Sequence, residues 1–219
     1  MRRMIFAEQV NESEVLVGDE IVRAGAEADT FEQYTAPHSA RIAELADALA
    51  VRFSFALRDR QMLKKAAFFH DVGELEMNRA YISDPRTLTG PERLDLYRHP
   101  VIGEQQAAKR DFPRAVQLMV RWHHEWWNGS GYPDKLKADQ IPLAARILRI
   151  CDTYAALTSE RPFRKAFSSR EADTYIAEAA GIEFDPRLSL AFLDLPERIV
   201  EQPVAEEQEF PAEDPAETE

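Results

Sequence analysis

Apolar residues recur along this chain at the three- and four-residue spacing of α-helices, without a convincing run of alternating apolar and polar residues. After His38, the residues Ile42, Leu45 and Leu49 fall on one helical face. A chain with this period buries helical faces against one another, so the sequence predicts an all-α fold.

Two histidines continue predicted apolar faces. His70 lies seven residues after Leu63, on the stripe of Ala66, and His123 lies seven residues after Val116. Both imidazoles are therefore expected to point into the core. A lone histidine at such a place is more often a satisfied core residue than a ligand. The chain has only five histidines, however, and the other three also lie where a ligand could act: His38, His99 and His124.

Five imidazoles and the neighbouring carboxylate of Asp71 suit a centre of two divalent metal ions. A neutral imidazole binds such ions, and a carboxylate can bridge two of them. Two-metal centres commonly hydrolyse phosphate esters.

His99 is expected at a junction between helices. Thr89 and Glu92 have the spacing of a capping box before a short helix, and Pro100 can stand in the first turn of the next one.

Asp152 lies inside an apolar helix, between Leu148 and Ala156. A buried carboxylate needs a partner, which could be an arginine such as Arg146 or Arg149, or a metal ion. Together with the histidines, the position favours metal ligation.

The formal charge of −12 is concentrated at the carboxyl end. The last nineteen residues carry eight acids and no base, which leaves −4 for residues 1–200. Residues 195–219 are expected to form a disordered tail, and binding of duplex nucleic acid through a broad basic face is not expected. A single cysteine, Cys151, and the lack of a signal peptide or membrane span predict a cytoplasmic protein that does not enter a membrane.

Five blocks of sequence occur in a characteristic order: HSARI at 38–42, HDVGE at 70–74, HPVIG at 99–103, HHEWWNGSGYP at 123–133 and DTYAALTSERPFR at 152–164. From about residue 35 to about residue 190 the chain resembles the HD-GYP domain of the bacterial HD phosphohydrolase superfamily. Many of its members hydrolyse cyclic di-GMP. The resemblance implies one multi-helix bundle with a buried two-metal site over residues 35–194, preceded by a helical extension over 1–34. The extension could pack on the core or form a homodimer contact.

The resemblance also implies the ligand sets. One ion would be held by His38, His70, Asp71 and Asp152, and the second by Asp71 as a bridge together with His99, His123 and His124. Iron or manganese is expected. Some members bind a third ion through a glutamate four residues before the first histidine. Here that position is Tyr34, and Glu32 is expected to lie off the face of His38, so two ions are predicted.

By the same resemblance, the reaction would be in-line attack on a phosphodiester by a hydroxide that bridges the two metals. Asp71 would act in catalysis, the loop of Gly131, Tyr132 and Pro133 would shape the substrate cleft, and Arg161 and Arg164 would contact the phosphate and base of the substrate.

Three positions depart from the family pattern: Glu74 replaces a lysine, Asn128 an aspartate and Ala155 an acid. Glu74 reverses the charge where an anion should bind, and Ala155 removes an expected contact to guanine. Asn128 keeps the turn-forming ability of aspartate. Glu74 could join the catalytic centre by binding an ion or orienting a histidine, or it could be an exposed glutamate at a helix end.

Three functions are consistent with these residues. The favoured one is a metal-dependent phosphodiesterase that acts on cyclic di-GMP or a related cyclic dinucleotide. The alternatives are an impaired receptor or interaction module that binds such a ligand without turnover, and a phosphohydrolase with a different phosphorylated substrate.

Overall fold

The computed structural model describes residues 17–162 and 164–196. This part of the chain is helical, with only isolated bridges in place of strands, so the all-α prediction is confirmed. The helices are α2 (Asp19–Phe31), α3 (His38–Arg52), α4 (Leu57–Phe69), α5 (Val72–Met77), α6 (Gly90–Leu96), α7 (His99–Lys109), α8 (Arg114–Trp122), α9 (Leu143–Leu157), α10 (Ser169–Glu178) and α11 (Pro186–Leu193), with short 3-10 turns at Ala80–Ile82 and Ala138–Gln140.

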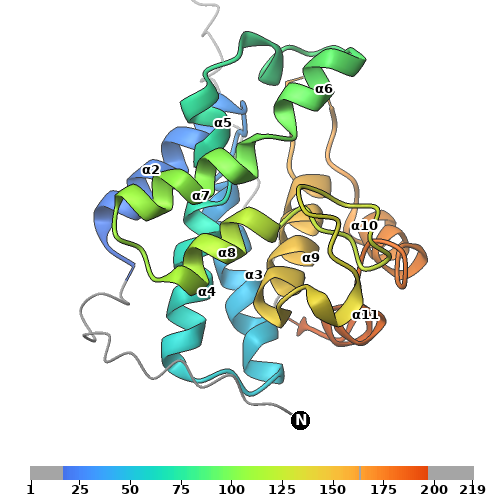
Figure 1. Cartoon of the computed structure of the whole chain (residues 1–219). Coiled ribbons are helices and arrows are strands. Elements are labelled where there is room, and N and C mark those ends of the chain that lie inside the picture. The colour runs from blue at the N-terminus through green and yellow to red at the C-terminus, as the bar shows by residue number, and fades with distance from the viewer. Residues whose placement is uncertain (1–16, 163, 197–219) are drawn as a thin grey trace, which may run out of the picture.

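The core lies where α3 packs against α4 and α9, and α4 against α8 (Figure 1). The apolar stripes in the sequence supply it: Leu49, Leu63, Val120 and Leu148 are all fully buried. Burying an aliphatic side chain of this size contributes about 1.5–3 kcal/mol. Helices α10 and α11 pack against α9, at the lower right of Figure 1.

Helix α2 packs on α3, α4 and α5, so the amino-terminal helix belongs to the bundle. At the other end, Leu195 is buried and joins the core. Residues 1–16 and 197–219, which include most of the expected disordered tail, lie outside the described residues.

The predicted helix junction at His99 is present. Thr89 caps α6 through a capping box with Glu92, and α7 begins at His99 with Pro100 in its first turn. Helix α5 crosses α7 closely at Gly73. A Cβ atom at Gly73 would lie 2.0 Å from the His99 carbonyl oxygen, so only glycine allows this approach. The contact fixes the distance between the helices that carry Glu74 and His99.

Candidate metal centre

The ends of several helices converge at one side of the core and bring the predicted ligands together. His38 begins α3, His70 follows the last residue of α4, His99 begins α7, and His123 follows the last residue of α8. Asp152 projects from the middle of α9. Ends of helices place side chains at the margin of a core, where a polar site can form beside packed apolar faces.

The converging residues form two groups. In each, one nitrogen or carboxylate oxygen per residue lies within 4.8 Å of the others. One group is His38, His70 and Asp152, and the other is Asp71, His99, His123 and His124.

Asp71 joins the two groups. Its Oδ2 lies 2.9 Å from Nε2 of His70, and its Oδ1 lies 3.2 Å from Nε2 of His99 and 3.4 Å from Nε2 of His123. One carboxylate thus faces both groups, as a bridging ligand must.

Three of the histidines are held with Nε2 toward Asp71. Nδ1 of His70, His99 and His123 lies 2.8, 2.8 and 2.7 Å from the backbone carbonyl oxygen three residues earlier. A carbonyl oxygen only accepts, so Nδ1 carries the proton in each ring. The Nε2 lone pair of a neutral ring is then free for a cation, an arrangement common among metal-binding histidines.

The electrostatics of the site show strongly interacting groups. Burial lowers the pKa of His70, but the Asp71 carboxylate outweighs it and raises that pKa to about 10. Burial opposes ionisation of Asp71, yet the charge of His70, followed by the close contacts of His123 and His99, holds its pKa well below the usual value.

Several buried atoms of the site have no hydrogen-bond partner among the described residues: both ring nitrogens of His38, Nε2 of His70 and Oδ1 of Asp71. An unsatisfied buried polar atom costs about 1–3 kcal/mol. Nitrogen and carboxylate donors left free in this way fit a divalent first-row metal ion.

A cavity of about 430 Å³ opens onto both groups. It is lined by Asp71, His99, His124 and Asp152, and by Arg149, Arg161 and Arg164, whose guanidinium groups bring positive charge beside the acids. Such a mixed lining suits a phosphorylated ligand that meets cations and arginines together.

Glu74 lies inside this cavity with an exposure of 7%. Helix α4 ends before Asp71, and the separate helix α5 turns Glu74 inward. Its Oε1 lies 3.6 Å from Nδ1 of His99. Burial and the nearby Asp71 carboxylate raise the pKa of Glu74 to about 7. The alternative of an exposed glutamate at a helix end is therefore wrong.

Glu32, which was expected to lie off the face of His38, lines the same cavity. Helix α2 ends at Phe31 and α3 begins at His38, so one helical register does not relate the two positions. The Glu32 side chain is buried, and its Oε2 accepts a hydrogen bond of 3.0 Å from Arg161. Burial, followed by repulsion from Asp71, raises the pKa of Glu32 well above its usual value.

In the loop of Gly131, Tyr132 and Pro133, Tyr132 is the member that lines the cavity. Its ring stacks on His124, with centroids 4.8 Å apart. A Cβ atom at Gly131 would lie 2.3 Å from the backbone nitrogen of Trp126, so glycine is required for this close packing. The peptide bond between Tyr132 and Pro133 is cis.

No pattern in the sequence marks Glu125 as the residue that anchors this loop. Its buried carboxylate accepts hydrogen bonds from the backbone nitrogens of Asp134 and Leu136, at 2.7 and 3.0 Å. The two bonds fix the chain directly after Pro133, and so help to hold Tyr132 over His124.

Of the three departures from the family pattern, only Glu74 lines the cavity. Ala155 is fully buried among apolar residues, and Asn128 makes a local turn in which its Oδ1 accepts from the Ser130 nitrogen at 2.8 Å. Ala155 and Asn128 therefore do not shape this cavity. The turn expected of Asn128 is present.

Arg149 is a residue of the site that the sequence suggested only as a partner for Asp152. Its NH1 lies 3.4 Å from Oδ2 of Asp152 and 2.9 Å from Nδ1 of His124, so it touches one member of each group. Its NH2 lies 2.5 Å from the buried Glu183 carboxylate. Arg146 instead pairs with Asp185. The signal in the sequence was the spacing of three residues between Arg149 and Asp152.

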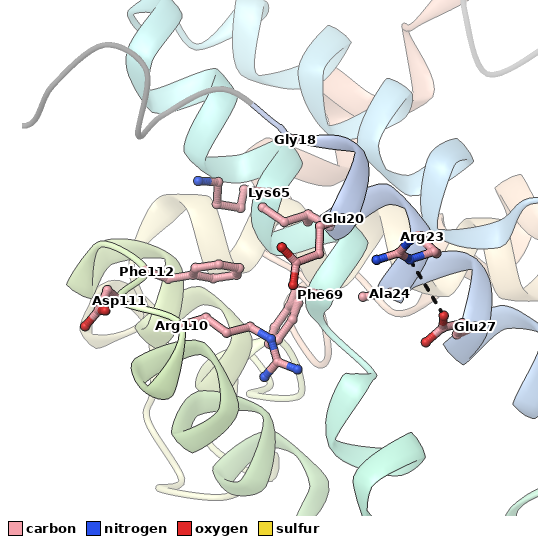
Figure 2. A pocket seen from close by; sticks show the side chains of 11 residues that line it. Gly18, Glu20, Arg23, Ala24, Glu27, Lys65, Phe69, Arg110, Asp111 and Phe112 are labelled. Atoms are coloured by element: carbon pink, nitrogen blue, oxygen red, sulfur yellow. Dashed lines mark ion pairs between the residues drawn. The ribbon is translucent and has the colours of Figure 1, made fainter.

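A separate cavity of about 480 Å³ lies between α2, α4 and the turn before α8 (Figure 2). Lys65 lies over the ring of Phe112, and Arg110 over that of Phe69. The lining includes neither a histidine nor a member of the two groups, so this cavity is not part of the candidate metal centre.

Among the described helices, none combines the length and the apolar character needed to cross a membrane.

Comparison with known proteins identifies the class to which this fold and site belong. The family model described as "HD domain" matches residues 28–188. The chain therefore belongs to the HD domain family, and its domain is HD-GYP-like.

Individual relatives are bacterial phosphodiesterases. A cyclic di-GMP phosphodiesterase of Vibrio cholerae is 33% identical over 195 residues, which cover 82% of this chain and 40% of the relative. The 3'3'-cGAMP-specific phosphodiesterase 3 of the same organism is 33% identical over 158 residues, covering 72% of this chain and 34% of that protein. The chain thus spans about two fifths or less of the length of these relatives.

Among solved structures, a cyclic GMP-AMP-specific phosphodiesterase of V. cholerae (V-cGAP3) superposes with a TM-score of 0.66 at 18% identity. The match covers 82% of this chain and 49% of that one, and it supports the HD-type helical fold.

Proposed function

We propose that this domain is a metal-dependent phosphodiesterase that hydrolyses cyclic di-GMP or a related cyclic dinucleotide. The observation that carries the proposal is that Asp71 contacts histidines of both groups of ligand side chains. Asp71 also lines a cavity whose wall includes arginines. Relatives named for cyclic di-GMP and for 3'3'-cGAMP support the substrate class and leave its choice of nucleobases to experiment.

The residues proposed to hold the first ion are His38, His70, Asp71 and Asp152, and those for the second are Asp71, His99, His123 and His124. Iron or manganese is the proposed occupant. When bound, two such ions lower the pKa of an attacking water and neutralise charge on the phosphate.

The chain's own residues would bind and orient the substrate. Arg149, Arg161 and Arg164 line the cavity and are proposed to contact phosphate oxygens and a base. Tyr132, held between His124 and Tyr97, offers a rigid aromatic wall beside the phosphate position.

Glu74 is proposed to act within the centre, either by binding an ion or by orienting His99. Titrating metal into Glu74→Gln and into the matched control Glu76→Gln, on the exposed side of the same helix, tests this role. We expect Glu74→Gln alone to change metal affinity, by about tenfold or more. An affinity equal to that of the control would contradict the role.

The function is tested with purified protein reconstituted anaerobically with Fe(II) or Mn(II), and assayed against cyclic di-GMP, 3'3'-cGAMP, cyclic di-AMP and linear dinucleotides. The proposal predicts a linear dinucleotide or mononucleotide product from at least one cyclic substrate, and loss of product in Asp71→Asn. Binding without turnover would instead support a receptor or interaction module. Turnover of a different phosphate ester alone would support a phosphohydrolase with another phosphorylated substrate.

A further inference from the structure

His38 is held in the site differently from His70, His99 and His123. Those rings each donate from Nδ1 to a carbonyl oxygen. His38 is the first residue of α3, and neither of its ring nitrogens has a hydrogen-bond partner among the described residues. Its Nε2 faces Asp152 Oδ1 at 3.5 Å. Something other than a hydrogen bond to the backbone must therefore set the orientation of this imidazole.

The ring of Tyr34 lies flat against His38. The ring centroids are 3.8 Å apart and the planes are inclined by only 10°. The guanidinium carbon of Arg161 also lies 3.8 Å from the centroid of Tyr34. Two groups this close to one ring centre cannot share a face, so Tyr34 lies between them.

Arg161 is itself fixed, because its NH2 donates to the buried Glu32 carboxylate at 3.0 Å. The stack of His38, Tyr34 and Arg161 is thereby closed at its outer end by an ion pair. The imidazole and the guanidinium hold opposite faces of the Tyr34 ring. These contacts restrict the orientation of both the Tyr34 and the His38 rings.

We propose that Tyr34 is a positioning residue that orients the His38 imidazole and couples it to the Arg161 guanidinium. Tyr34 then orients the His38 ring, as backbone carbonyl oxygens orient the rings of His70, His99 and His123. The coupling to substrate rests on the proposed function, whereas the orientation of His38 does not.

The orientation is tested on metal-free protein by NMR of the five histidine rings, in wild type and in Tyr34→Phe, Tyr34→Leu and Tyr34→Met. Phenylalanine keeps the stacked ring, so the His38 signals should stay sharp and close to their wild-type positions. In the aliphatic variants they should broaden as the imidazole samples more than one orientation, a change that loss of the tyrosine ring current alone does not produce, while those of His70 and His123 stay sharp.

Tyr97→Leu is the matched control, because Tyr97 stacks on Tyr132 instead of on His38. It should leave the His38 signals unchanged. Tyr34 is only partly buried, and the two aliphatic variants give two chances of a folded protein. His38 signals that stay sharp in a folded aliphatic variant would overturn the proposal.

A second readout is metal affinity, measured by calorimetric titration of Mn(II) without nucleotide. Tyr34→Leu should weaken one of two binding events by at least about tenfold, the usual effect of removing a group that orients a ligand, and Tyr34→Phe should restore it. Equal affinities in all variants would contradict the positioning role. Failure to hydrolyse cyclic dinucleotides would count against the proposed function alone, because neither readout uses substrate.

Discussion

Glu74 places a carboxylate next to Asp71 in a buried cavity, and this has a consequence for stability. Its pKa rises from 4.5 in the unfolded chain to about 7 in the folded protein. The folded state therefore favours the protonated form. The stability associated with that proton is fully present below pH 4.5 and is lost as the pH rises through 7.

Glu74→Gln should remove this loss in metal-free protein. Each pKa unit is worth about 1.4 kcal/mol, so above pH 7 the variant should be more stable than wild type by about 3 kcal/mol. At pH 4 the two should unfold at the same denaturant concentration. Urea unfolding at pH 4, 6 and 8 measures the difference, and a difference independent of pH would contradict this account of Glu74.

Arg149 should contribute to substrate binding, because it lines the cavity and contacts both His124 and Asp152. With metal-loaded protein and the proposed cyclic dinucleotide as substrate, Arg149→Gln should raise KM by about tenfold, since a charge-assisted hydrogen bond contributes about 1.5–3 kcal/mol. Arg146→Gln, one turn earlier on α9, removes a buried arginine paired with Asp185. A KM for Arg149→Gln no higher than that of Arg146→Gln would show that Arg149 only supports the fold.

The sequence predicted the position of those site residues that belong to a periodic apolar pattern. His70 and His123 could be placed on the inner face of a helix because the apolar residues beside them lie three to seven positions away. Glu32 and Arg161 are 129 residues apart in the chain, and Arg149 and Glu183 are 34 apart. Pairs of this kind depend on how helices pack, which no local pattern specifies.

At the scale of elements, Gly73 determines how closely α5 approaches α7. Gly73→Ala would bring a Cβ atom to within 2.0 Å of the His99 carbonyl oxygen, so the helices must move apart. Overpacking of this kind typically costs about 1–3 kcal/mol, and a clash with backbone should reach the upper end. We expect a clear fall in the thermal unfolding midpoint and weaker metal binding through His99.

Gly90→Ala is the control for that prediction, since a Cβ atom there has nothing within 4 Å. It should leave the unfolding midpoint unchanged or slightly raised, because alanine favours the helix over glycine. Similar midpoints for the two variants would contradict the tight contact at Gly73.

The helices themselves were largely predictable, and their breaks were predictable only where capping residues mark them. The spacing of Thr89 and Glu92 predicted the start of α6, and Pro100 predicted the first turn of α7. The break between α4 and α5 at Asp71 has no proline or capping pattern, so the sequence left open whether one helix ran from His70 to Glu74. The chain turns between α4 and α5, and this turn buries the Glu74 side chain.

For the whole molecule, helices that are distant in sequence bring two acids and five imidazoles into two neighbouring groups. Buried ligand atoms without hydrogen-bond partners make the metal-free fold less stable than it would be with ions. A ligand that binds only the folded state stabilises it by mass action. At a concentration 100 times the dissociation constant, Mn(II) should add about 2.7 kcal/mol per occupied site to the free energy of unfolding. A midpoint that does not change with Mn(II) concentration would contradict this.

Elemental analysis decides whether Asp71 and its neighbours bind two metal ions, as proposed. Protein loaded anaerobically with Fe(II) or Mn(II) and freed of unbound metal should contain two ions per chain. Asp71→Asn should contain fewer, because Asp71 faces both groups. Loaded wild-type protein without bound metal, or an Asp71→Asn variant that keeps both ions, would contradict the account.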